Sequence, residues 1–144
     1  MADLLSETGN AATVALKQNS DLAGIASRIY NVEAPATPTW PWVLVGNPTE
    51  NARIESGYDV ASMSLTVHGF VKPDITINPR PMVYPATAAI ANSIKRALDG
   101  KVIYRGGVEL HFTHEQTQII RDSAEVSAYH EIVRFAVGVN GEVQ

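Results

Sequence analysis

The sequence contains no cysteine, which excludes disulfide frameworks, thiolate nucleophiles and zinc sites with cysteine ligands. It contains no block of five or more Lys and Arg residues, so binding to nucleic acid through phosphate neutralisation is not indicated. No apolar run approaches the roughly 18 residues of a membrane-spanning helix. Residues 1–20 also lack the basic start and apolar centre of a signal peptide. We therefore expect a protein made and kept in a cytoplasm, with no membrane partner.

The composition is that of a folded domain. The 144 residues are 45% hydrophobic, and a domain of this size buries roughly 70% of the surface of its unfolded chain. Charged residues make up 18%, below the roughly 25% of soluble domains, and the net charge is −4. We expect a single domain over residues 1–144, with a flexible N-terminus over about residues 1–8 and a proline-rich arm or loop over about residues 72–84. The low charge predicts that partners cover part of the surface.

Two segments have the periodicity of helices. Apolar residues at spacings of three and four predict a helix over residues 11–17, and Asp21 is suited to cap a second helical turn over residues 21–26. A longer helix is predicted to begin at Pro85 and to end before Gly100. The apolar stripe of this longer helix consists of Ile90, Ile94, Ala97 and Leu98.

Alternation of apolar and polar residues predicts strands. It is clearest over residues 60–71, where Met63, Leu65 and Val67 alternate with serine and threonine. The other predicted strands are residues 28–32, 42–46, 108–113 and 129–139, and the last two are expected to form an antiparallel hairpin. Residues 49–58 are interpreted as an exposed loop or hairpin tip, and residues 74–77 as an edge strand or arm.

These elements define the expected fold class. We predict an α+β fold in which a mostly antiparallel sheet of about four or more strands packs against two helices on one face.

The residues that most often carry chemistry are not arranged as an active site. His111 and His114 are three residues apart on a strand, so they point to opposite faces, and no third metal ligand is evident. No G-x-S-x-G motif accompanies the serines at positions 62, 64, 123 and 127. The carboxylates of Asp74, Glu109 and Glu131 are interpreted as solvated. We therefore predict no catalytic, cofactor-binding or metal-binding residues and no enzymatic activity.

Trp40 and Trp42 flank Pro41. Two large aromatic residues around a proline are typical of a ligand platform or an interface anchor. They are equally consistent with a ring that caps the edge of the core, and the sequence leaves both interpretations open.

The whole pattern from about Ala15 to Val139 resembles the tail-terminator or tail-completion proteins of long-tailed bacteriophages. The stretches that carry the resemblance are Arg28-Ile29-Tyr30-Asn31, Pro41-Trp42-Val43-Leu44-Val45-Gly46, Ser64-Leu65-Thr66-Val67-His68-Gly69-Phe70, Ala88-Ala89-Ile90-Ala91-Asn92-Ser93-Ile94 and His130-Glu131-Ile132-Val133-Arg134-Phe135. The third stretch is similar to the Leu-Thr-Leu-His-Val-Trp type of run that is common in that family. Residues 72–84 depart from the family by being longer and richer in proline, so the resemblance implies no role for them.

The resemblance implies a virion subunit that forms a hexameric ring on the head-proximal end of the tail tube. Such a ring ends tube polymerisation and provides the interface to the neck or connector, and DNA passes through its lumen without specific binding. The implied partners are the chain itself, the tail tube protein and the neck or connector protein. The implied location is the virion, with the host cytoplasm as the site of assembly.

A ring is closed by heterologous contacts, which require two different patches on each subunit. The candidate patches are the proline-rich arm, with Ile75, Ile77 and Arg80, and the charged tip formed by Arg53, Glu55 and Tyr58. The arm is equally well interpreted as folding back on its own core.

Other functions are consistent with the same pattern. They include another head-to-tail joining subunit, a tail-tube protein, a small enzyme or ligand-binding domain with a pocket between sheet and helices, and a soluble host domain that dimerises through an edge strand.

Overall fold

The computed structural model of the chain describes residues 4–55, 58–72, 84–121 and 128–140. The helices of this part of the chain are α1 (Leu4–Gln18), the 3-10 helix η1 (Ser20–Arg28) and α2 (Tyr84–Leu98). The strands are β1 (Ile29–Asn31), β2 (Trp42–Val45), β3 (Thr49–Glu55), β4 (Tyr58–Val71), β5 (Val102–Arg105), β6 (Val108–Arg121) and β7 (Tyr129–Asn140).

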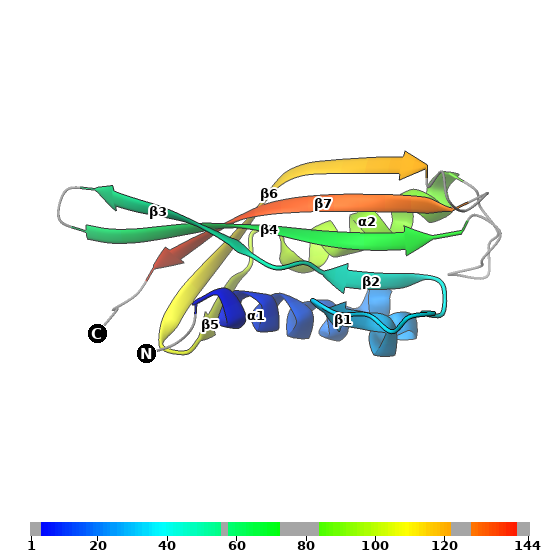
Figure 1. Cartoon of the computed structure of the whole chain (residues 1–144), viewed down its shortest axis with the longest axis horizontal. Coiled ribbons are helices and arrows are strands. Elements are labelled where there is room, and N and C mark those ends of the chain that lie inside the picture. The colour runs from blue at the N-terminus through cyan, green and yellow to red at the C-terminus, as the bar shows by residue number, and fades with distance from the viewer. Residues whose placement is uncertain (1–3, 56–57, 73–83, 122–127, 141–144) are drawn as a thin grey trace.

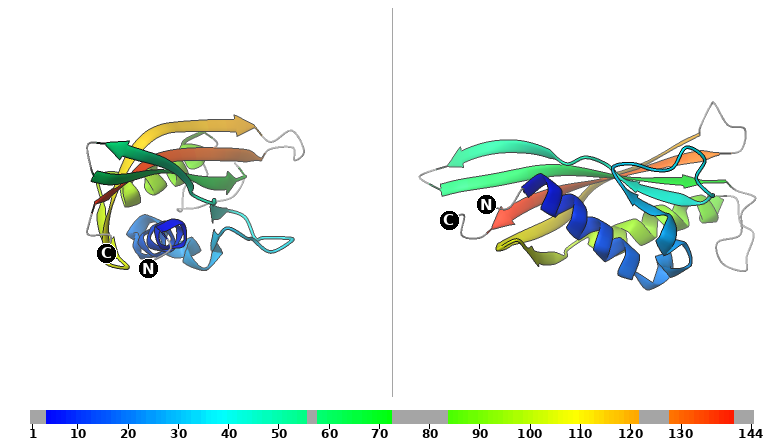
Figure 2. Two further views of the ribbon diagram at one scale, coloured as in Figure 1. Left: turned by 60° about the vertical axis from the view of Figure 1, so that its left-hand side comes forward. Right: turned by 60° about the horizontal axis from the view of Figure 1, so that its bottom comes forward.

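All seven strands belong to one sheet (Figure 1). The strand order is β1-β2-β4-β7-β6-β5, and β3 pairs with β4 outside this path. Every pair is antiparallel except β1 with β2, which is parallel. Helices α1 and α2 lie on the same face of the sheet (Figure 2). The predicted α+β fold, with a mostly antiparallel sheet and helices on one face, is therefore confirmed.

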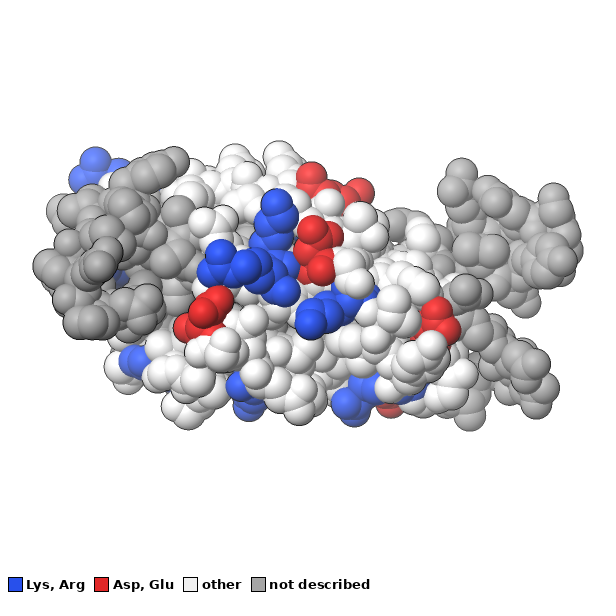
Figure 3. Space-filling view, turned by 180° about the vertical axis from the view of Figure 1, so that it is seen from behind, with Lys and Arg blue, Asp and Glu red and all other residues white. Residues whose placement is uncertain are grey.

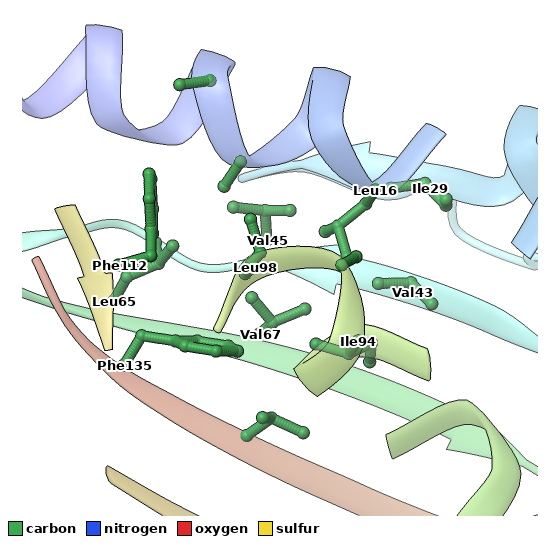
Figure 4. Close-up of a cluster of buried hydrophobic side chains, with 14 of the residues drawn as sticks. Leu16, Ile29, Val43, Val45, Leu65, Val67, Ile94, Leu98, Phe112 and Phe135 are labelled. Carbon is green, nitrogen blue, oxygen red and sulfur yellow. The ribbon is translucent and has the colours of Figure 1, made fainter. Parts of the chain in front are cut away.

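The core lies between this face of the sheet and the two helices (Figure 4). Odd-numbered residues of β4 and β7 point into it, so that Leu65, Val67 and Phe135 are completely buried. Leu16 of α1 and Leu98 of α2 meet them from the helical side. Truncating one such leucine to alanine typically costs about 2–5 kcal/mol, so this layer is a main source of the stability of the fold.

Helix α1 begins seven residues before its predicted start at residue 11. Residues 4–8, predicted to be flexible, are its first turns. The Thr8 hydroxyl donates to the Leu4 carbonyl at 2.7 Å, and Thr8 is completely buried at the core. Helical spacing continues from Thr8 through Ala12 to Leu16 on the buried face, although the sequence at the start of the helix is polar enough to hide this pattern.

Residues 49–55 form β3 and Tyr58 begins β4, so the segment predicted as an exposed loop or hairpin tip is largely strand. The two strands pair from Thr49 with Ser64 to Glu55 with Tyr58, so the expected hairpin tip is the end of a long β-hairpin. This hairpin extends past the helices at one end of the molecule (Figure 1). Because no helix covers it, its strands need no apolar face, and the polar sequence of β3 gives no alternation to recognise.

Strand β6 contains an irregularity that changes which of its residues face the helices. His114 pairs with Phe135 and Gln116 pairs with Arg134, so Glu115 is an extra residue in a β-bulge. Before the bulge the even-numbered residues, such as Phe112, are buried. After it the odd-numbered residues face the helical side, because Thr117 and Ile119 pair with Val133 and Glu131.

Candidate functional site: the open face of the sheet

The face of the sheet opposite the helices carries the even-numbered residues of β4 and β7. In β4 these are Ser62, Ser64, Thr66, His68 and Phe70, and all of them are partly exposed, whereas the odd-numbered residues from Met63 to Val71 are buried. No described helix packs on this face (Figure 2). The described helices therefore leave this open face of the sheet uncovered.

An aromatic row crosses three strands of the open face, one ring from each. Trp42 of β2 is opposite Phe70 of β4, and Phe70 is opposite His130 of β7. The ring centroids of Trp42 and Phe70 are 3.9 Å apart with an interplanar angle of 9°. Those of Phe70 and His130 are 4.5 Å apart with an angle of 11°. Cross-strand aromatic pairs contribute roughly 0.5–1.5 kcal/mol each beyond the area that they bury.

Two further aromatic rings and a cation extend this row. Tyr30 and Trp40 each make edge-to-face contacts with Trp42, with centroids 6.3 Å away. The peptide bond from Trp40 to Pro41 is cis, and the Lys72 ammonium lies 4.8 Å from the centroid of the Trp40 ring. The two half-buried tryptophans are thus part of the open face, and their role as interface anchors stays a prediction.

His68 and His130 form a hydrogen-bonded pair next to the row. His68 Nδ1 is 2.7 Å from His130 Nε2. Burial lowers the pKa of His68, and the nearby His130 lowers this pKa further. A bond between two ring nitrogens needs one donor and one acceptor, so at least one ring is neutral when the pair is formed.

Glu131 is adjacent to His130 but points into the core, and its side chain is completely buried. Its Oε2 accepts from the Ala91 N–H of α2 at 3.3 Å, and its Oε1 has no hydrogen-bond partner among the described residues. Burial raises the pKa of Glu131 to about 8, against the smaller opposing effect of the Ala91 N–H. The carboxyl is therefore mainly neutral at pH 7, and the interpretation of Glu131 as a solvated carboxylate was wrong.

The residue opposite Glu131 in β4 is Gly69, and its lack of a side chain makes room for the carboxyl. A Cβ at position 69 would lie 2.5 Å from Glu131 Oε1 and 3.0 Å from Ile90 Cγ2. The sequence contains a signal for this buried carboxyl, since position 131 lies on the apolar face of its strand between Tyr129 and Val133. The pairing of His68 with His130 gave no such signal, because a single sequence does not fix the register of distant strands.

His111 and His114 lie apart, as their spacing predicts. His111 Nε2 bonds to Glu109 Oε1, and His114 Nε2 lies 2.7 Å from Thr117 Oγ1. The described part of the chain contains no group of three or more residues able to hold a metal ion. None of its helices is long and apolar enough to cross a membrane.

The six predicted interface residues fall into two groups. Arg53 and Glu55 lie in β3 and Tyr58 begins β4, so the charged tip is the end of the projecting hairpin. Ile75, Ile77 and Arg80 lie outside the described residues, as do Asp74, Ser123 and Ser127.

The opposite side of the molecule carries interspersed charges and a pocket. Basic and acidic side chains lie beside one another there, without a continuous area of one sign (Figure 3). Among the ion pairs are Arg96 with Asp21 at 3.1 Å and Arg105 with Glu7 at 2.8 Å. A pocket of about 640 Å³ lies between α1 and β5 and is lined by Val14, Gln18, Lys101, Tyr104 and other residues.

Together these features describe a contact surface more than a reaction centre. The aromatic row supplies apolar area that is rigid and partly exposed, which is the composition of interface anchors. Each histidine of the central pair bonds to the other, and the buried carboxyl lies on the far side of the sheet.

The fold and the open face define the class of the protein as a single-sheet α+β domain with one uncovered face. No protein-family model matches the sequence, and no curated protein matches it. The fold does match solved structures. It is similar to a chain of a structure described as the virion of a native gene transfer agent particle, with a TM-score of 0.76 and 14% sequence identity, over 98% of this chain and 100% of that chain.

A second solved structure, whose name carries no functional description, is 10% identical with a TM-score of 0.54. The match covers 98% of this chain and 96% of that chain. Both matches span nearly the whole domain, so the arrangement of helices and sheet is shared as a unit. At these identities the similarity establishes the fold.

Proposed function

We propose that the chain is a non-catalytic structural subunit of a phage-like virion, and that it forms a ring of six at the head-proximal end of a tail tube. In this role the ring ends polymerisation of the tube and presents an interface to the neck or connector. The observation that carries the proposal is the similarity of fold, over the whole chain, to a chain of a gene transfer agent virion. The sequence stretches that resemble tail-terminator proteins support it independently.

The surface of the domain is consistent with this role. The open face and its aromatic row supply a large contact area without a catalytic cluster among the described residues. The net charge of −4 disfavours tight binding of DNA, which suits a ring through which DNA has to move. The partners of the proposed ring are further copies of the chain, the tail tube protein and the neck or connector protein.

Two segments are proposed to make the contacts between subunits. One is the hairpin tip with Arg53, Glu55 and Tyr58, which projects from the body of the domain. The other is the proline-rich arm with Ile75, Ile77 and Arg80. A ring needs two different patches on each subunit, and these segments are separate in the sequence.

Native mass spectrometry and negative-stain electron microscopy test the proposal. We expect hexamers and short closed rings, and we expect addition of the protein to tail-tube subunits to limit tube length. Long tubes formed by the chain alone would identify a tube subunit instead. A strict monomer that leaves tube length unchanged contradicts the proposal. Deletion of residues 74–78 is expected to give folded monomers, and unchanged ring assembly by this variant would remove the arm from the interface.

A further inference from the structure

Among the described strands, one long strand at the edge of the sheet has no second partner along half of its length. Strand β5 pairs with β6 only as far as His111, and Asp99 Oδ1 accepts from the His114 N–H at 2.9 Å. Over residues 115–121, the described part of the chain provides β6 with a single partner strand, β7. The opposite edge of this segment presents backbone N–H and C=O groups that another strand can bind.

This edge lacks most of the usual features that prevent pairing with another chain. Natural edge strands are often short or carry lysine and proline. Residues 113–121 contain no lysine and no proline, and Ile120 is 41% exposed on the open face. The bulge at Glu115 is confined to the beginning of the segment, and pairing with β7 is regular from Gln116 to Arg121. The segment is therefore suited to accept an added strand.

A strand of matching length lies at the other end of the molecule. Strand β3 has 7 residues and pairs with β4, and no described strand pairs with its second edge. The free segment of β6, residues 115–121, has the same length. The other unpaired edges of the described strands are shorter, because β1 has 3 residues, β5 has 4, and β4 lacks a β7 partner only over residues 58–61.

We infer that residues 115–121 of β6 in one copy of the chain pair with β3 of the next copy, so that the sheet continues from subunit to subunit. The free half of β6 and the β3–β4 hairpin lie toward opposite ends of the molecule (Figure 1). Joining two different edges in this way gives a head-to-tail contact, which forms a ring where the rotation between copies closes and does not form a two-fold dimer. The inference rests on the self-association in the proposed function and specifies the surface that mediates it.

The hydrogen bonds of β6 show which backbone groups are available. Phe112, whose side chain faces the helices, directs its N–H and C=O away from β7, since they bond to Lys101 and Gly100. Within one strand, side-chain face and hydrogen-bonding direction alternate together. After the bulge the residues facing the helices are Thr117 and Ile119, so their N–H groups point to the free edge.

Thr117→Pro tests this contact without disturbing the pairing with β7. The substitution removes an N–H that points outward, and the proline ring occupies the place of the added strand. We expect the variant to fold, as shown by an unchanged far-UV circular dichroism spectrum. We expect its apparent dissociation constant for assembly to be higher by a factor of at least about ten. Thr117→Val is the matched control. It also loses the bond between Thr117 and His114 but keeps the N–H, and we expect it to assemble like the original chain.

Disulfide crosslinking locates the partner strand, and the cysteine-free sequence makes it specific. By strand alternation, residue 49 of β3, which is opposite Ser64, and residues 116 and 118 of β6 lie on the open face. After oxidation, variants with one cysteine in each strand should give a ladder of covalently linked oligomers on a non-reducing gel. The largest oligomer should have as many copies as the ring. Variants with either cysteine alone should give no ladder beyond a dimer.

The outcomes separate this inference from the proposed function. Normal rings of Thr117→Pro together with the absence of ladders would overturn the strand contact while leaving the ring intact. A protein that stays monomeric, does not limit tail tubes and gives no crosslinks at about 1 mM contradicts both. Assembly that is lost in Thr117→Pro and in Thr117→Val alike would indicate a role of the His114 bond instead of the free N–H.

Discussion

At the scale of single residues, the most unusual feature is a carboxyl group inside the core. Glu131 is completely buried, and its one described hydrogen bond comes from the Ala91 N–H. Burial of a charge without a partner is costly, which is why the carboxyl favours its neutral form. Folding raises its pKa from 4.5 to about 8, so the folded state binds the carboxyl proton more tightly than the unfolded state. The stabilisation that results is fully present below pH 4.5 and is lost as the pH rises through 8.

We therefore expect Glu131→Gln to stabilise the protein at alkaline pH. A neutral amide fills the same space and still accepts from Ala91, but it does not ionise. At pH 9 the free energy of unfolding should exceed that of the original chain by about 2–4 kcal/mol, and the difference should shrink towards pH 5. Urea unfolding at pH 5, 7 and 9 measures this change.

The exposed Glu33 provides a matched control for this experiment. Because its side chain stays in water on folding, Glu33→Gln should give a difference from the original chain that changes little with pH between 5 and 9. If the unfolding free energies of Glu131→Gln and the original chain differ by the same amount at every pH, the carboxyl is not protonated in the folded protein.

His68 responds to pH in the opposite direction. Its pKa is lowered from 6.5, so the neutral ring is favoured in the folded state, and stability is lost as the pH falls below 6.5. Glu131 and His68 thus lie on opposite faces of the sheet, on the neighbouring strands β7 and β4, and have opposite pH dependences.

At the scale of elements, sequence periodicity was informative wherever an element has one buried face. It located α2, β2, β4, β7 and the first half of β6, because each packs on the core with a regular spacing of apolar residues. Residues 114–121 of β6 were not predicted, and most of them are exposed. It missed β5, whose apolar residues Val102 and Tyr104 are 44% and 73% exposed, and which therefore looks like a surface segment. It also placed Glu131 in solvent, because glutamate is rarely buried in folded proteins, even at a position on the apolar face of a strand.

The β3–β4 hairpin is the element whose removal best separates folding from assembly. Asn51 and Ser62 are paired, and Ser62 is also where pairing with β7 begins. Replacing residues 52–61 by Asn-Gly should close a tight two-residue turn. Because the removed part lies beyond the helices, we expect the free energy of unfolding to change by no more than about 1–2 kcal/mol.

Assembly of this shortened chain should be lost, because it lacks most of β3. Chemical unfolding and native mass spectrometry of the same sample measure the two effects. A full-length chain with Arg53→Ala and Glu55→Ala keeps the backbone of the hairpin. Loss of rings in this variant as well would assign assembly to the side chains of the tip, and loss in the shortened chain alone would assign it to the backbone edge of β3. If the shortened chain formed rings, neither the tip nor the edge of β3 would be needed for self-association.

At the scale of the whole molecule, the charge distribution argues against affinity for DNA. The net charge is −4, and the helical side mixes both signs (Figure 3). Several basic residues are engaged in ion pairs, such as Arg96 with Asp21 and Arg105 with Glu7. Proteins that bind DNA without sequence preference do so by neutralising phosphates with clustered cations.

We therefore expect no binding of duplex DNA at physiological salt up to protein concentrations of about 100 µM, where non-specific binders are largely bound. Fluorescence anisotropy of a labelled duplex at several salt concentrations measures this. Binding that weakens steeply with added salt would show that a set of residues on the chain contacts phosphates. This result would contradict the proposed lumen, through which DNA passes without being bound.

The position of β7 within the sheet sets the order in which the molecule is completed. β7 follows every other described strand in the sequence, yet it lies between β4 and β6 at the centre of the sheet. Its pairing with β4 joins residues such as Leu65 and Phe135, so a long loop of chain must be closed before the central ladder forms. Until residues 129–140 have been synthesised, β4 and β6 have no strand between them to pair with. A nascent chain therefore has no complete sheet to offer a neighbour, and subunit association has to follow synthesis of this last strand.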